Sequence, residues 1–148
     1  MSAAKGLSEA AGVPIVAVSR LELLAQKHES KGVVWAVLVA GRGEFYAGEY
    51  RDGVCLGEGL YTLNALENMV SGVQEMVFCE TSQELVLKDF HLVRVEEPGV
   101  EDLLNAGMRR LEQGAFDDAA TLDANYLWRM EDEILARLAA QAPRGAAG

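Results

Sequence analysis

Apolar residues recur at helical spacing near the N-terminus and predict two helices there. The first covers residues 2–11, and Gly12 supplies its end. The second covers residues 21–27, because Ser19 followed by Glu22 forms a capping-box pattern, in which each side chain satisfies a free N–H group of the first helical turn.

Further along the chain, the strongest helix is predicted between Pro98, which starts it, and Gly114, which ends it. Its apolar stripe consists of Val100, Leu103, Leu104, Met108 and Leu111. Shorter helices are predicted for residues 62–70, opened by a Thr62 cap, for residues 81–88 and for residues 131–138.

Continuous or alternating apolar runs predict strands between the helices. Residues 33–40 form an uninterrupted apolar run, typical of a strand buried on both faces, so Trp35 within it should be buried. Glycine turns at 41–43 and 52–53 predict a three-stranded meander with residues 44–51 and 54–56. Other predicted strands are residues 15–18, 75–80 and 91–95. We therefore expect an α/β fold with a mixed sheet flanked by helices.

The length of the chain and its charge restrict the number of domains and the kinds of partner that we expect. With 148 residues, half of them hydrophobic, the chain suits one domain, expected over residues 1–142, and a disordered tail over residues 143–148. A net charge of −10 repels phosphate and anionic lipid, so direct binding to nucleic acid or membranes is disfavoured. No apolar run approaches the roughly 20 residues of a membrane span and no signal peptide is evident, so we expect a cytoplasmic protein.

Candidate chemistry is sparse. Cys55 and Cys79 are expected to be reduced core thiols, and Cys79 with His91 could form a nucleophile and base dyad, which makes a hydrolase the alternative function. His28 has no second ligand at metal-binding spacing. The acidic residues Asp117, Asp118 and Asp123 are expected to be a solvated loop. No catalytic residue, metal or cofactor is therefore predicted.

The Gly41-Arg42-Gly43 turn leads into a strand and not into a helix N-terminus, so it predicts a hairpin and no phosphate cradle. Arg42 and Glu44 are then exposed candidates for contact with a partner. Tyr46 and Tyr50 share one face of the following strand, where they either pack or form a binding surface.

Four segments, in order, carry a resemblance to a known family. They are Ser2-Ala3-Ala4-Lys5-Gly6-Leu7, Val13-Pro14-Ile15-Val16-Ala17-Val18-Ser19, Arg42-Gly43-Glu44-Phe45-Tyr46 and Asn125-Tyr126-Leu127-Trp128-Arg129. They resemble the bacterial TsaB family of tRNA threonylcarbamoyladenosine biosynthesis proteins, which are grouped with TsaD and carry the older label of M22 glycoproteases. Specific matching covers about the first 50 and the final 30 residues.

The resemblance implies a partial actin-like ATPase domain of the ribonuclease H-like type and a subunit without catalysis of its own. In the family, a paralogous TsaD carries the metal and transfers the threonylcarbamoyl group to a tRNA adenosine, TsaB supports it through a helix-mediated dimer, and the ATPase TsaE joins them. The expected partners are therefore a TsaD-like protein and a TsaE-like ATPase, with a homodimer when the chain is alone.

The departures from the family concern the start of the chain and one turn. The family's first strand and its Gly-Pro-Gly-Ser-Phe-Thr-Gly loop would lie before Met1, so the chain resembles a TsaB without most of its N-terminal actin-like half, and we expect no appreciable ATP or ADP binding. Where the family often has Asp-Ala-Arg-Arg, this chain has Val39-Ala40-Gly41-Arg42, which leaves a role for the missing acid and base in doubt.

The first helix is the expected partner-binding element. Its stripe has mostly small side chains, which permit close approach of another helix at about 8–10 Å between axes. The stripe residues are Ala3, Ala4, Leu7, Ala10 and Ala11. The alternative is that this stripe packs on the domain's own sheet.

Overall fold

A computed structural model describes residues 2–29, 31–70, 74–79, 87, 89–119 and 122. The helices predicted for 81–88 and 131–138 and the tail predicted for 143–148 lie outside these residues, apart from the single position 87. Backbone contacts divide the chain into two compact units, Met1–Val16 with Ala115–Gly148, and Ala17–Gly114. The single domain expected over residues 1–142 stays a prediction.

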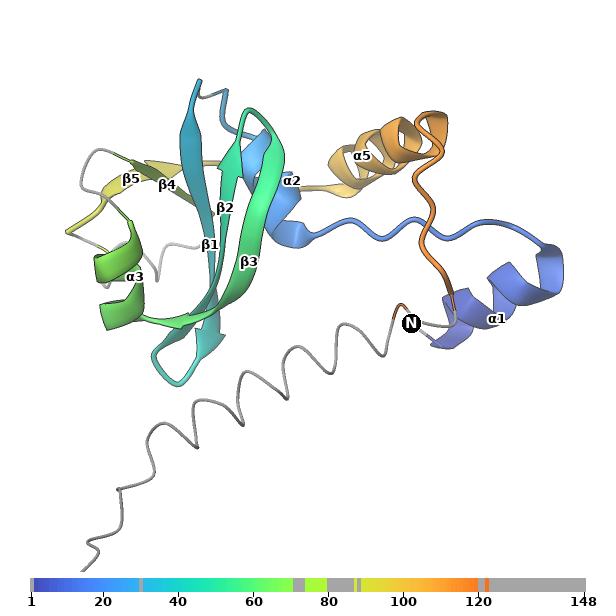
Figure 1. Ribbon diagram of the computed structural model, residues 1–148, viewed down its shortest axis with the longest axis horizontal. Helices are drawn as coiled ribbons and strands as arrows, with labels where there is room; N and C mark the ends of the chain where they lie inside the picture. Colours follow the sequence, from blue (N-terminus) through green and yellow to red (C-terminus); the bar gives the residue numbers. More distant parts are fainter. Residues whose placement is uncertain are drawn as a thin grey trace, which may run out of the picture. The chain divides into compact units, whose positions relative to one another are not determined.

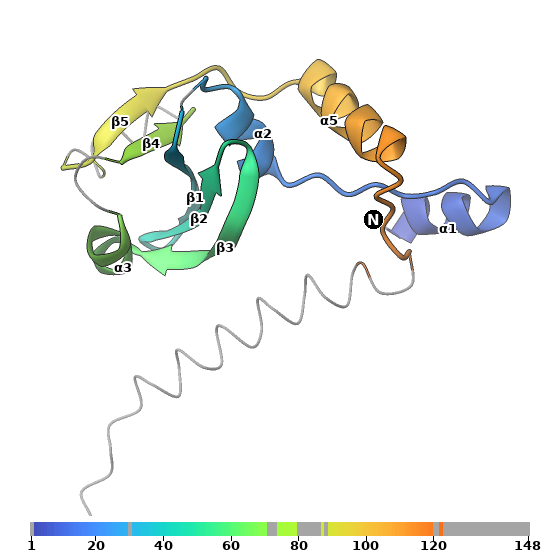
Figure 2. The same cartoon turned by 45° about the horizontal axis from the view of Figure 1, so that its top comes forward.

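The larger unit contains a five-stranded mixed sheet, shown in Figure 1 and, turned by 45°, in Figure 2. Its strands are β1 (Val33–Gly41), β2 (Glu44–Arg51), β3 (Val54–Thr62), β4 (Glu75–Phe78) and β5 (His91–Arg94). The spatial order is β3-β2-β1-β4-β5, with antiparallel pairing from β1 to β3 and parallel pairing of β1 with β4 and β4 with β5. The predicted meander and the mixed α/β sheet are confirmed.

Strand β1 lies at the centre of this sheet because its side chains are apolar on both faces. Trp35 is only 2% exposed, as expected from the sequence. Its ring meets Tyr61 edge-on at 6.3 Å between centroids, and its indole N–H donates to Gln74 Oε1 at 3.2 Å. The central strand is therefore held in place by the packing of Trp35 and by the hydrogen bond of its indole N–H.

Two short helices cover opposite faces of the sheet (Figures 1 and 2). Helix α2 (Arg20–Gln26) packs against one face through a cluster made of Leu21, Leu24, Ala25, Val34, Ala36, Leu38, Tyr50 and Val77. Helix α3 (Leu63–Met69) packs against the other face, where the Thr62 hydroxyl accepts from the N–H of Ala65 and caps the helix as predicted. The central strands of the sheet are thus buried on both sides.

Helix α5 (Val100–Glu112) follows β5, and among its residues, all of which the structure describes, only Ala106 is buried. Its polar side carries the contacts with α2. Asp102 lies 2.8 Å from the Lys27 ammonium, and Arg109 donates to Gln26 Oε1 at 2.7 Å. The predicted apolar stripe is present but faces solvent.

The smaller unit contains helix α1 (Ser2–Ala11), which ends where Gly12 takes a positive φ of 64°. The chain then makes one isolated bridge between Ile15 and Asp117, in which the N–H of Asp117 donates to the Ile15 carbonyl at 2.9 Å. The strand predicted for residues 15–18 is therefore wrong, since a single bridge replaces a ladder.

Two local predictions need correction. Strand β3 runs for nine residues and not three, because its pairing with β2 continues through Gly57 and Gly59 to Thr62. At the start of α2, Ser19 accepts from the N–H of Leu21 as predicted, but the capping box does not form as expected, because the Glu22 carboxylate contacts Gln26 and Arg110.

Candidate functional site

The α1 stripe is exposed within the smaller unit. Leu7 is 71% exposed, and the four alanines of the stripe, Ala3, Ala4, Ala10 and Ala11, are exposed too. Close to the end of the helix, Ser8 accepts from the N–H of Val13 at 3.2 Å and its hydroxyl donates to the Val13 carbonyl at 2.5 Å, which stabilises the turn after α1. This surface could accept another helix.

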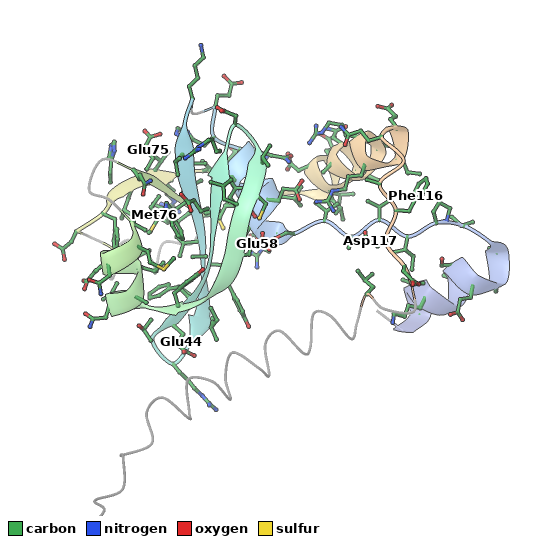
Figure 3. All side chains as sticks on the ribbon, in the orientation of Figure 1. Glu44, Glu58, Glu75, Met76, Phe116 and Asp117 are labelled. Carbon is green, nitrogen blue, oxygen red and sulfur yellow. The ribbon has the colours of Figure 1, made fainter. Side chains whose placement is uncertain are left out.

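The other predicted contact residues lie at the β1–β2 turn of the larger unit. Arg42 is exposed and holds a positive φ of 54°, between two glycines that also have positive φ, so the hairpin is confirmed. Glu44 begins β2 beside the turn (Figure 3) and is half-buried, so the expectation that it is exposed is wrong. The two groups of predicted residues belong to different units, since α1 lies in the smaller one.

A cluster around Glu58 was not predicted. Glu58, on β3, accepts at one carboxylate oxygen from the hydroxyls of both Ser19, at 2.5 Å, and Tyr50 (Figure 3). Tyr50 has no exposed surface and belongs to the core, and the half-buried Tyr46 packs against the α2 cluster, so packing is the role that the structure supports for this pair. The cluster ties the start of α2 to the edge strand.

A β-bulge directs Cys55 toward this cluster. The pairing of β2 with β3 shifts register between Glu49 and Tyr50, so that Glu49 pairs with Gly57 but Tyr50 pairs with Cys55. The extra residue, Leu56, turns the Cys55 side chain to the face that carries Tyr50. Cys55 is exposed, so the prediction that it is a core thiol is wrong.

The electrostatics of the cluster keep the Tyr50 phenol and the Cys55 thiol protonated at neutral pH. Burial, followed by the hydrogen bond that Tyr50 donates to Glu58, raises the pKa of Tyr50 well above its ordinary value of 10.0. Burial, followed by the negative charge of Glu58, raises the pKa of Cys55 above 9.0. A nucleophilic thiol needs a lowered pKa, and Cys55 has the opposite shift.

One sequence signal pointed to this close approach. Gly48 lies in the middle of β2, where glycine weakens a strand, and a Cβ there would come within 2.9 Å of Glu58 Cγ and of the Tyr50 ring. The glycine therefore makes room for the Tyr50–Glu58 pair. An isolated glycine inside a strand pattern is the feature that could have found it.

The Cys79–His91 dyad does not form, because the strands place its members apart. His91 begins β5 opposite Glu75 of β4, whereas Cys79 follows the end of β4. Four residues at about 3.3 Å each separate them by roughly 13 Å along the strands. Cys79 is half-buried beside the α2 cluster, close to the predicted core position.

The polar candidates do not form a metal site. Through its Nε2 atom, His28 pairs with Glu75 Oε2 at 2.8 Å instead of standing alone in a loop. Across the described parts of the chain, no three His, Cys, Asp or Glu side chains gather as metal ligands. Asp117 joins the bridge to Ile15, and Asp118 is exposed, while Asp123 lies outside the described residues.

Polar side chains also fill the junction of α2 and α5. Arg110 donates to the Ala17 carbonyl and to the Glu22 carboxylate, so it joins α5 to both the start of α2 and the segment before it. A shallow hollow of about 470 Å³ lies beside this junction. It is lined by Leu23, Gln26, Gly53, Asp102, Asn105 and Arg109. The Asp102 and Arg109 groups in its wall already have protein partners.

Comparison with solved structures places this fold in the actin-like, ribonuclease H-like α/β class. The chain is similar to a Pseudomonas aeruginosa protein described as having similarity to peptidase YeaZ, with 21% identity and a TM-score of 0.61, over 80% of this chain and 61% of that one. It is also similar to YeaZ from Pseudomonas aeruginosa, with 21% identity and a TM-score of 0.56, over 80% of this chain and 62% of that one. At this identity the likeness shows the fold.

The chain therefore spans a little over three fifths of the length of the solved proteins that it matches. No protein-family model matches its sequence, and the search of curated proteins gave no match. Among the described residues, no helix has the length and apolar character that a membrane span needs.

Proposed function

We propose that this chain is a non-catalytic accessory subunit that docks onto a TsaD-like protein in threonylcarbamoyl transfer to a tRNA adenosine. The observation that carries the proposal is the YeaZ-like fold, since YeaZ proteins are TsaB proteins. The ordered resemblance of Ser2–Leu7, Val13–Ser19 and Arg42–Tyr46 to TsaB segments supports it independently.

Helix α1 is the proposed docking element. Leu7 supplies one large apolar side chain, and the flanking alanines allow the axis of a partner helix to come close. An exposed leucine surrounded by small residues is a small but suitable contact for helix packing. The same surface would pair two copies of the chain when no TsaD-like protein is present.

Transfer chemistry is assigned to the partner. The raised pKa of the Cys55 thiol and the separation of Cys79 from His91 both argue against a nucleophile in the described residues. The net charge of −10 argues that a tRNA would be held by the partner and not by this chain. A TsaE-like ATPase is the proposed third member of the assembly.

The test is calorimetric titration of the full chain with the TsaD-like protein of the same genome. We expect binding by the wild type, at least about tenfold weaker binding by Leu7→Glu, and unchanged binding by the control Leu56→Glu, which alters an exposed leucine of β3. Both variants should retain the wild-type circular dichroism spectrum. Absence of binding by the wild type, or equal binding by Leu7→Glu, would refute the proposal.

A further inference from the structure

Helix α5 is turned opposite to the usual arrangement of an amphipathic helix, with its polar side inward. Asp102, Arg109 and Arg110 face α2 and contact Lys27, Gln26 and Glu22. These contacts fix the rotation of the helix about its axis. The apolar stripe is consequently directed away from α2.

This stripe is a continuous apolar surface and not a scatter of single residues. The exposed fractions are 72% for Val100, 46% for Leu103, 60% for Leu104, 54% for Met108 and 41% for Leu111. Spacings of three and four residues align them along one side of the helix over about three turns. Contiguous exposed apolar surface of this kind marks an interaction site.

The shape of the stripe suits another helix. Gly107 lies within it, and a Cβ built at that position meets nothing within 4 Å, so the surface has a notch between Leu103 and Leu111, which lie four residues before and after it. A small residue between larger ones lets a second helix pack close, near the lower end of the usual distance of about 8–10 Å.

The charge beside the stripe is negative. Glu101 and Glu112 are eleven residues apart, about three helical turns, so both lie along the same flank, and both are exposed. The arginines of the last turn, Arg109 and Arg110, are held by α2. A partner with Lys or Arg beside its own apolar stripe would therefore meet complementary charge.

A second copy of the chain fits this surface poorly. An antiparallel two-fold pair of α5 helices would place Glu101 of one copy beside Glu112 of the other at both ends of the contact. These like charges repel each other, so charge selects a different protein for this face.

We infer that the outward face of α5 is a docking surface for an amphipathic helix of another protein, one whose apolar stripe is flanked by Lys or Arg. This surface belongs to the sheet-containing unit and is distinct from α1, the proposed docking element for the TsaD-like protein. The apolar contact supplies the attraction between the helices, and Glu101 and Glu112 select the basic partner.

The test uses two synthetic peptides of roughly 18 residues, long enough to cover the stripe, with identical leucine positions at helical spacing. One carries Lys along the flank and the other carries Glu at the same positions. Fluorescence anisotropy with the full chain should show the Lys peptide binding at least about tenfold more tightly than the Glu peptide, and more weakly in high salt than in low salt.

Variants of the chain locate the binding. Leu104→Glu and, separately, Met108→Glu should each weaken binding of the Lys peptide at least about tenfold, and because both side chains are exposed, neither should change the unfolding midpoint. Leu7→Glu is the matched control on α1 and should leave peptide binding unchanged, although it weakens binding to the TsaD-like protein. Loss of peptide binding at α5 can thus be distinguished from loss of binding to the TsaD-like protein at α1.

Three results would overturn the inference. They are equal binding of the Lys and Glu peptides, equal loss of peptide binding in Leu7→Glu and Leu104→Glu, and a wild-type dimer that Leu104→Glu converts to a monomer. The last result would assign the α5 face to a second copy of this chain.

Discussion

Helices α2 and α5 have similar amphipathic patterns but opposite roles in the structure. Helix α2 buries its apolar residues against the sheet, with Leu24 completely enclosed. Helix α5 is the longer of the two and has the more regular stripe, yet it exposes that stripe and attaches through Asp102, Arg109 and Arg110. A clear apolar stripe therefore identifies an amphipathic helix without showing which side faces its own domain.

The difference arises from what each helix meets. The face of the sheet beside α2 offers Val34, Ala36 and Val77, which are apolar. The outer side of α2 offers Glu22, Gln26 and Lys27, which can pair only with polar groups. Helix α5 meets this second surface and presents its own polar side to it, because a buried charge without a partner is costly.

The largest difference between the two helices is expected when one leucine in each is replaced by alanine. Leu24→Ala in α2 should lower the free energy of unfolding by about 2–5 kcal/mol, because it leaves a cavity in a closed core. Leu104→Ala in α5 should change it by no more than about 0.5 kcal/mol, since that side chain is exposed. Urea denaturation followed by circular dichroism measures both, and similar losses would show that α5 is packed like α2.

A smaller effect is expected at the start of α2. Glu58→Ala should cost about 1–3 kcal/mol of unfolding free energy, because the buried Tyr50 hydroxyl loses its acceptor. Glu58→Gln should cost less, since an amide oxygen still accepts. Adding Tyr50→Phe to Glu58→Ala should cost little more, and a double-mutant cycle by urea denaturation tests this coupling. Strictly additive losses would mean that the two side chains act independently.

The smallest effect concerns the polar attachment of α5. The hydrogen bond from Lys27, followed by that from the N–H of Gly99, lowers the pKa of Asp102 below its ordinary value of 3.8. The folded-state pKa lies below the unfolded one, so this contact stabilises the fold above the unfolded pKa and is lost as pH falls through the folded one.

Carboxyl NMR titration should place the Asp102 midpoint below 3.8 in the wild type, because the ionised carboxylate is held by Lys27. In Lys27→Ala the midpoint should move back toward that value. A midpoint that is the same in both proteins would mean that Lys27 does not hold Asp102 in solution.

The amino-acid pattern alone determined the elements of the sheet unit. Three of these patterns act within a few residues and can therefore be predicted without tertiary contacts. They are the apolar run of β1, the glycine turns on either side of β2 and the Thr62 cap. The burial of Trp35 followed because a strand that is apolar on both faces belongs in the middle of a sheet.

Tertiary structure decided how those elements meet and therefore where chemistry could lie. The parallel register of β4 and β5 separates Cys79 from His91, and the bulge at Leu56 turns Cys55 toward Tyr50. Local spacing in the sequence predicts neither relation, because strand register depends on pairing between segments that are distant in sequence. The outward direction of the α5 stripe was likewise decided by polar groups on α2, some 80 residues earlier in the chain.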